Sequence, residues 1–126
     1  MFKEHINIII VESSSLLCEK IVFELSANYQ IKIIGKAKNY DGFLKITKES
    51  IPCVVLMDID LEDGKGIELI KTIRTINKEI KIIIFTNLSG QSYRELSLEM
   101  GAHSFFDKSA GFEQIVNQLV EIQSHY

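Results

Sequence analysis

Tryptophan is absent from this 126-residue sequence, which also holds only one proline and two cysteines. Cys18 and Cys53 form neither a CxxC pair nor a zinc-binding spacing, which excludes a disulfide framework and a cysteine zinc site. Apolar runs such as residues 8–11 are far shorter than the roughly 20 residues of a membrane span, and no signal-peptide pattern precedes them. We therefore expect a cytoplasmic protein with reduced cysteines and no membrane partner.

A surplus of positive charge is also missing. Fourteen Lys and Arg residues face seventeen Asp and Glu residues, which leaves a formal charge of -3. Domains that bind nucleic acid usually carry a basic surplus, so we expect no direct contact with nucleic acid. The apolar share of 46% and the length are typical of one domain that forms its core without metal or disulfide support. The sequence predicts a single domain over residues 1–126.

Strand-like and helical patterns alternate along the chain. Five short runs rich in β-branched residues predict strands over residues 6–11, 31–35, 53–58, 81–86 and 104–106. Apolar residues at helical spacing fill the intervals, as in the series Ile67, Ile70, Ile73 and Ile76. Helix boundaries are indicated by possible N-caps at Ser13–Ser15 and Asn39, by Gly66 at a helix start and by Gly101 at a helix end.

The predicted strands are almost wholly apolar, which indicates that both faces of their sheet are covered. Strict alternation of strand and helix then predicts an α/β fold, a (βα)5 doubly wound, flavodoxin-like domain with five parallel strands in the order 2-1-3-4-5. In such sheets, ligands bind beyond the carboxyl ends of the strands where the order reverses. The functional site is therefore expected at the ends of the first and third strands.

Polar residues stand at these strand ends: Glu12, Asp58, Thr86 and Lys108 follow four different strands. Clustered carboxylates attract a hard cation such as Mg2+, which prefers oxygen ligands. A carboxylate can also accept a phosphoryl group when a metal, a cationic side chain and hydrogen-bond donors meet the transferred charge. Asp58 is the candidate nucleophile, with Lys108 and Thr86 as the supporting cation and donor.

These residues resemble the receiver domain of two-component response regulators, in the CheY-like superfamily, over nearly the whole chain. In "LMDIDLEDGKG" the motif places a phospho-accepting Asp at position 58 and a Gly eight residues later, at Gly66. The resemblance maps the hydroxyl residue that ends the fourth strand to Thr86, and the lysine after the fifth strand to Lys108. It implies that Asp58 becomes an aspartyl phosphate contacted by both.

The resemblance also implies a metal site, a switch and partners. Mg2+ would be held by Glu12, by Asp58 and by the backbone carbonyl of Asp60, and a switch would couple Thr86 to Phe105. The phosphoryl group would come from a histidine kinase or phosphotransfer protein of a phosphorelay. A downstream protein would bind the face formed by the fourth helix, fifth strand and fifth helix, and a homodimer is a further option. Beyond its own phosphorylation and dephosphorylation, no enzyme activity is expected.

Four positions depart from the family pattern. Ser13 replaces the second of two adjacent acids, so we expect weaker Mg2+ binding. Glu62 stands where proline is frequent, Asn87 where the family favours very small residues, and Ser109 where proline often follows the lysine. Neither Asn87 nor Ser109 by itself excludes phosphorylation.

Two alternatives stay open on the sequence. Ser13 also suits a degenerate receiver that acts as a phosphorylation-independent interaction module. The pair Asp58 and Asp60 resembles the DxD motif of haloacid-dehalogenase-type phosphatases. That motif ends a first strand and has Thr or Val at its fifth position, whereas this one ends the third strand and has Glu62 there. The phosphatase is thus the remote alternative.

Overall fold

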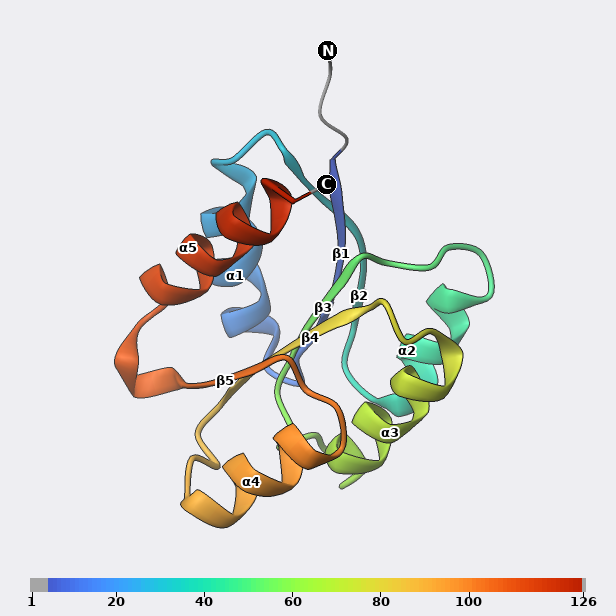
Figure 1. Cartoon of the computed structure of the whole chain (residues 1–126). Helices are drawn as coiled ribbons and strands as arrows, with labels where there is room; N and C mark the ends of the chain where they lie inside the picture. The colour runs from blue at the N-terminus through green and yellow to red at the C-terminus, as the bar shows by residue number, and fades with distance from the viewer. Residues whose placement is uncertain (1–4, 126) are drawn as a thin grey trace.

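The computed structural model describes residues 5–125. Five parallel strands form one sheet in the order β2-β1-β3-β4-β5, which confirms the predicted doubly wound α/β fold (Figure 1). The strands are β1 (Ile6–Val11), β2 (Ile31–Ala37), β3 (Val54–Met57), β4 (Lys81–Thr86) and β5 (Ser104–Asp107). The helices are α1 (Ser15–Ser26), α2 (Tyr40–Thr47), α3 (Gly66–Ile76), α4 (Gln91–Glu99) and α5 (Glu113–Gln123), with a short 3-10 turn η1 (Lys108–Ala110) before α5.

Three strands, β2, β3 and β5, differ from their predicted limits, and β5 does so only by continuing one residue further, to Asp107. The pairing register of β1 and β2 shifts between Ile8 and Ile9. With this shift, β2 stays paired with β1 past Gly35 and ends at Ala37. β3 ends at Met57, one residue before Asp58, although the Asp58 amide still donates to the carbonyl of Val11 at 3.0 Å. The aspartate is therefore fixed to β1 just beyond the regular strand.

The helices divide between the two faces of the sheet. Because the strand order reverses at β1, right-handed crossovers place α1 and α5 on one face and α2, α3 and α4 on the other (Figure 1). Each face has its own apolar core: Ile21 and Leu119 belong to the first, whereas Phe43 and Ile70 belong to the second. The sheet is thus covered on both sides, as the apolar strands predicted.

The predicted caps are present at two helix starts. The Ser14 hydroxyl accepts the Leu17 amide of α1 at 3.1 Å, and the Asn39 side chain accepts the Gly42 amide of α2 at 2.9 Å. Gly66 opens α3 for a second reason, since an ideal Cβ at this position would overlap the backbone carbonyl of Ile59. Only glycine lets α3 begin so close to the chain that leaves β3.

None of the helices within residues 5–125 has both the length and the apolar character to cross a membrane.

Candidate functional site

Asp58 lies at the carboxyl edge of the sheet, where it receives three hydrogen bonds. Its Oδ1 accepts the Thr86 hydroxyl at 2.5 Å and the backbone N–H of Asp60 at 2.8 Å. Its Oδ2 accepts the Lys108 ammonium at 2.6 Å. The residue is only 5% exposed. A buried carboxylate needs such donors to remain charged, and here every donor comes from a different segment of the chain.

Lys108 joins the two buried carboxylates of the site. Its Nζ lies 2.6 Å from Asp58 Oδ2 and 3.0 Å from Glu12 Oε1, and the other Glu12 oxygen accepts the Ser14 amide at 3.0 Å. Burial acts to lower the pKa of Lys108, but the hydrogen bonds and negative charges of Asp58 and Glu12 outweigh it and raise the pKa above its ordinary value. The lysine therefore carries its charge between two acids.

Thr86 is fully buried at the end of β4. Its hydroxyl donates to Asp58 and accepts the Leu88 amide at 3.1 Å, so the loop after β4 is tied to Asp58 through one oxygen. The strand-end rule placed Glu12, Asp58, Thr86 and Lys108 at one edge, and the structure brings all four together there.

The oxygen ligands available for a cation are few. Among residues 5–125, no three side chains of the His, Cys, Asp and Glu types form a metal-binding group. The site holds the carboxylates of Glu12 and Asp58, and the Asp60 amide bonds to Asp58 while the Asp60 side chain is exposed, so only the backbone of Asp60 is joined to the site. Mg2+ is commonly bound through one or two carboxylates together with phosphate oxygens. This donor set fits Mg2+ in that minimal form.

The Ser13 hydroxyl is engaged outside this donor set. It donates to the carbonyl of Lys38 at 3.1 Å and accepts the amide of Glu62 at 3.1 Å. Two other departures also lie at the rim: Asn87 is exposed after Thr86, and the Ser109 amide donates to Asp107 at 2.7 Å. Proline has no N–H to donate. Glu62 and Ser109 stand where the family often has proline, and each therefore supplies a backbone donor that the structure uses.

Phe105 lies inward, at 4% exposure, in the core beneath α4. The Arg94 guanidinium sits 5.6 Å from the centre of its ring, and Arg94 Nη1 donates to the Phe105 carbonyl at 3.1 Å. Sequence reasoning missed Arg94. Its only signal was its place in the helix before the fifth strand, since nothing in a helical pattern tells which way a long side chain turns.

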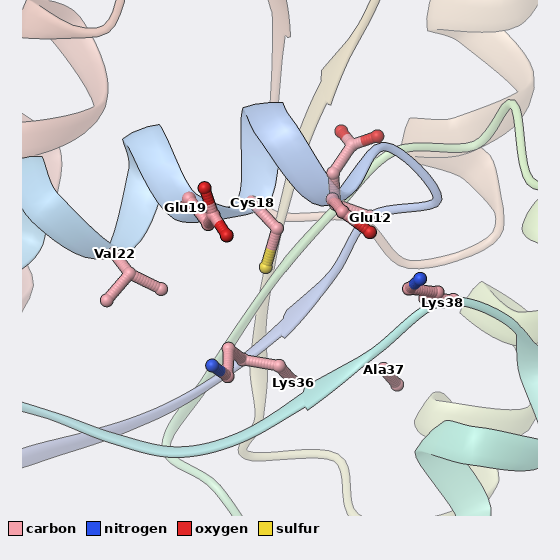
Figure 2. A pocket seen from close by; sticks show the side chains of 8 residues that line it. Glu12, Cys18, Glu19, Val22, Lys36, Ala37 and Lys38 are labelled. Carbon is pink, nitrogen blue, oxygen red and sulfur yellow. The ribbon is translucent and has the colours of Figure 1, made fainter.

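A groove of about 330 Å3 lies beside the site, between α1 and β2 (Figure 2). Glu12 lines one part of it, and Cys18 points from α1 toward β2, near Glu19 and Lys36. Burial raises the pKa of the Cys18 thiol, so the thiolate, which is the reactive form, is disfavoured. The groove therefore adds no reactive thiolate beside Asp58.

Comparison with known sequences identifies relatives over most of the chain. The family described as "Response regulator receiver domain" matches residues 8–120. A protein-glutamate methylesterase/protein-glutamine glutaminase of Clostridium acetobutylicum is 34% identical over 107 residues, which are 83% of this chain and 31% of that protein. Response regulator GacA of Pseudomonas aeruginosa is 24% identical over 93% of this chain and 55% of its own length. The chain thus spans about half or less of the length of these relatives.

Solved structures show the same fold. A LuxR-family two-component response regulator from an Aurantimonas species superposes with a TM-score of 0.88 at 22% identity, covering 97% of this chain and 87% of that one. A CheY-like receiver domain protein from Methanospirillum hungatei gives 0.86 at 19% identity, covering 97% and 96%. The phosphatase alternative is therefore not the family of this protein. The chain belongs to the family of response regulator receiver domains of two-component signalling.

Proposed function

We propose that Asp58 accepts a phosphoryl group from a histidine kinase or phosphotransfer protein, and that the domain signals through protein contacts. The observation that carries this proposal is the set of three donors on the buried Asp58 carboxylate, from Thr86, Lys108 and the Asp60 amide. Donors placed where negative charge develops stabilise a transferred phosphoryl group. Receiver domains as a family interact with histidine kinases and downstream effectors, which supports the same assignment.

The transfer is a displacement at phosphorus. An Asp58 oxygen bonds to the phosphorus of a phosphohistidine while the phosphorus–nitrogen bond breaks, and the imidazole keeps the bonding electron pair. The Lys108 ammonium lies between Asp58 and Glu12 and is close enough to bind the new phosphoryl oxygens. The Thr86 hydroxyl can also donate to these oxygens. Loss of either donor slows formation of the acyl phosphate or shortens its lifetime.

Receiver domains generally bind Mg2+ at an acidic pocket. In this chain Glu12, Asp58 and the Asp60 carbonyl would hold the ion, which supplies positive charge for the phosphoryl oxygens. Ser13 contributes no charge, and Lys108 already neutralises part of the charge of the two carboxylates. We therefore propose weak Mg2+ binding that strengthens when a phosphoryl group adds further oxygen ligands.

Signalling is proposed to run through Thr86 and Phe105 to the surface formed by α4, β5 and α5. Thr86 binds the acceptor directly, and Phe105 lies on the neighbouring strand beneath Arg94. A change in the Thr86 hydrogen bond would alter the space around Phe105 and, through Arg94, the position of α4. The downstream partner would be another protein or a second copy of this chain.

We further propose that residues 1–126 act as one domain without turnover beyond its own phosphorylation and dephosphorylation. The charge of -3 supports protein partners over direct contact with nucleic acid. One relative of known structure is described as a DNA-binding response regulator from Staphylococcus aureus, at 24% identity. That description concerns the other protein, and here it supports only the fold.

Intact mass after treatment with acetyl phosphate and Mg2+ tests the acceptor. We expect one added phosphoryl group, absent from Asp58→Asn, while Asp60→Asn, which keeps its backbone carbonyl, is still modified. The second candidate is a degenerate receiver that binds partners without phosphorylation, which the neutral Ser13 favours. No mass gain at saturating Mg2+, and none from a histidine kinase, would establish that candidate in place of ours.

A further inference from the structure

Ser13 connects three loops at the carboxyl edge of the sheet. It lies in the loop after β1, its hydroxyl donates to the Lys38 carbonyl in the loop after β2, and it accepts the Glu62 amide in the loop after β3. These partners are 25 and 49 residues away in sequence. One hydroxyl thus uses its donor and one of its acceptor sites to bridge the loops that follow three paired strands.

The geometry around Glu62 shows why its amide is free to make this bond. Residues 61–64 form a turn that is closed by the Gly64 amide donating to the Leu61 carbonyl at 2.9 Å. The second residue of such a turn does not use its N–H in the turn, which is why proline fits there. In this chain Glu62 takes that position and sends its N–H to Ser13. Residues 13 and 62 are therefore linked departures.

The same loop is tied down at its next residue. The two carboxylate oxygens of Asp63 accept the Tyr40 amide of α2 at 2.9 Å and the Lys65 amide at 3.0 Å. The loop also carries Asp60, whose amide donates to the acceptor Asp58. Fixing residues 62 and 63 therefore restrains the segment that orients one donor on Asp58.

We propose that Ser13 is a positioning residue, which fastens the 58–65 loop to the rim through the Glu62 amide and so holds the Asp60 donor on Asp58. Ser13 stands where the family has an acidic residue, but its hydroxyl does not replace that acid as a metal ligand. The part that concerns phosphoryl transfer rests on the proposed function. The loop attachment itself does not, and the two are tested separately.

A double-mutant cycle tests the attachment without any phosphorylation. Ser13→Ala and Glu62→Pro each remove one partner of the bond, and Glu62→Pro retains a residue suited to the turn. We expect Glu62→Pro to cost about five-fold more in the folding equilibrium constant when Ser13 is present than when Ser13→Ala has already removed the hydroxyl, as one hydrogen bond requires. Glu62→Ala keeps the N–H and is the control, with no coupling to Ser13→Ala. Additive effects of Ser13→Ala and Glu62→Pro would overturn the attachment.

Amide hydrogen exchange then tests positioning at the acceptor. In Ser13→Ala we expect faster exchange at Glu62 and also at Asp60, whose amide binds Asp58, with the Ile9 amide in the interior strand β1 unchanged. Ser13→Thr keeps a hydroxyl and should restore protection at both sites. Exchange that rises at Glu62 alone would show that Ser13 holds the turn without orienting the acceptor, and the positioning role would be wrong.

The rate of Asp58 phosphorylation supplies the functional readout. With acetyl phosphate at saturating Mg2+, Ser13→Ala should lower the maximal rate several-fold and leave the half-saturating acetyl phosphate concentration unchanged, and Ser13→Thr should restore the rate. An unchanged maximal rate would contradict positioning for transfer. If the parent chain takes up no phosphoryl group, the proposed function fails. Hydrogen exchange at the Asp60 amide then decides alone whether Ser13 orients the site.

Discussion

α3 and α4 cover the same face of the sheet, but they are held to it in different ways. α3 buries four of its residues, Gly66, Leu69, Ile70 and Ile73. Within α4 only Ser97 is buried, and its hydroxyl has no hydrogen-bond partner among the described residues 5–125. The apolar core anchors α3, whereas the residue that α4 buries is polar and gains no hydrogen bond from its burial. The two helices are therefore expected to differ in how readily they move.

The side chains that α4 leaves outside support this view. Tyr93, Leu96 and Leu98 are each about two-fifths exposed, and the helix is tied to β5 by Arg94, which contacts Phe105. Segments with few buried apolar contacts open at a lower free energy than the core. α4 thus combines weak anchoring with exposed apolar surface, as a helix that shifts and binds a partner requires. Around α3, by contrast, Ser13 and Asp63 fasten the preceding loop.

The largest expected effect is a core truncation in α3. Ile70→Ala should lower the free energy of unfolding by about 2 to 5 kcal/mol, because it leaves a cavity in a fully buried position. Leu98→Ala in α4 should cost under about 1 kcal/mol, since that side chain is 40% exposed. Urea unfolding of both variants checks the contrast. Equal losses would show that α4 is anchored as firmly as α3.

The contrast between the helices was not predicted from the sequence. The series Ile67, Ile70, Ile73 and Ile76 predicted a helix, but the pattern did not rank how firmly α3 and α4 are held to the sheet. The same reasoning found the sheet order and the convergence of Asp58 and Lys108, because strand ends in a parallel sheet share one edge. Local pattern and topology suffice for features of this kind.

Other features depend on side-chain direction, which pattern does not fix. The sequence marked Ser13 as a departure from the family pattern, but its bonds to Lys38 and Glu62 link segments whose approach depends on loop conformation. Arg94 reaches Phe105 through a long, flexible side chain, which no helical spacing specifies. The extension of β2 past Gly35 required a register shift that only paired strands can reveal.

Removing the orphaned hydroxyl of α4 should stabilise the domain. Ser97→Ala keeps the small side chain and deletes a buried group without a partner among residues 5–125, so we expect a gain of about 1 kcal/mol in the free energy of unfolding. Ser92→Ala, at an exposed position of the same helix, is the matched control with little change. A loss of stability in Ser97→Ala would mean that the hydroxyl is satisfied, and that α4 is better anchored than we infer.

Arg94→Met should loosen α4 with a cost of about 1 kcal/mol or less, because Arg94 is exposed and loses one hydrogen bond and one cation–π contact. Hydrogen exchange of α4 amides should increase while that of α3 amides stays constant. Arg94→Lys, which keeps the charge but not the forked guanidinium, should give an intermediate result. Equal changes in both helices would remove the distinction between them.

The smallest effect concerns the loop before α3 and depends on pH. Burial acts to raise the pKa of Asp63, but the amides of Tyr40 and Lys65 outweigh it and hold the pKa below its ordinary value. The unfolded chain, with an Asp pKa near 3.9, therefore binds the proton more readily than the folded one, so this stabilisation is present above about pH 4. It is lost as the pH falls through the lowered folded pKa. In Asp63→Asn, the acid-side slope of stability against pH should become shallower by a small amount, because Asp63 is exposed. Asp41→Asn, in the first turn of α2, is the comparison variant, and an identical slope change in both would show that the charge of Asp63 does not fasten this loop.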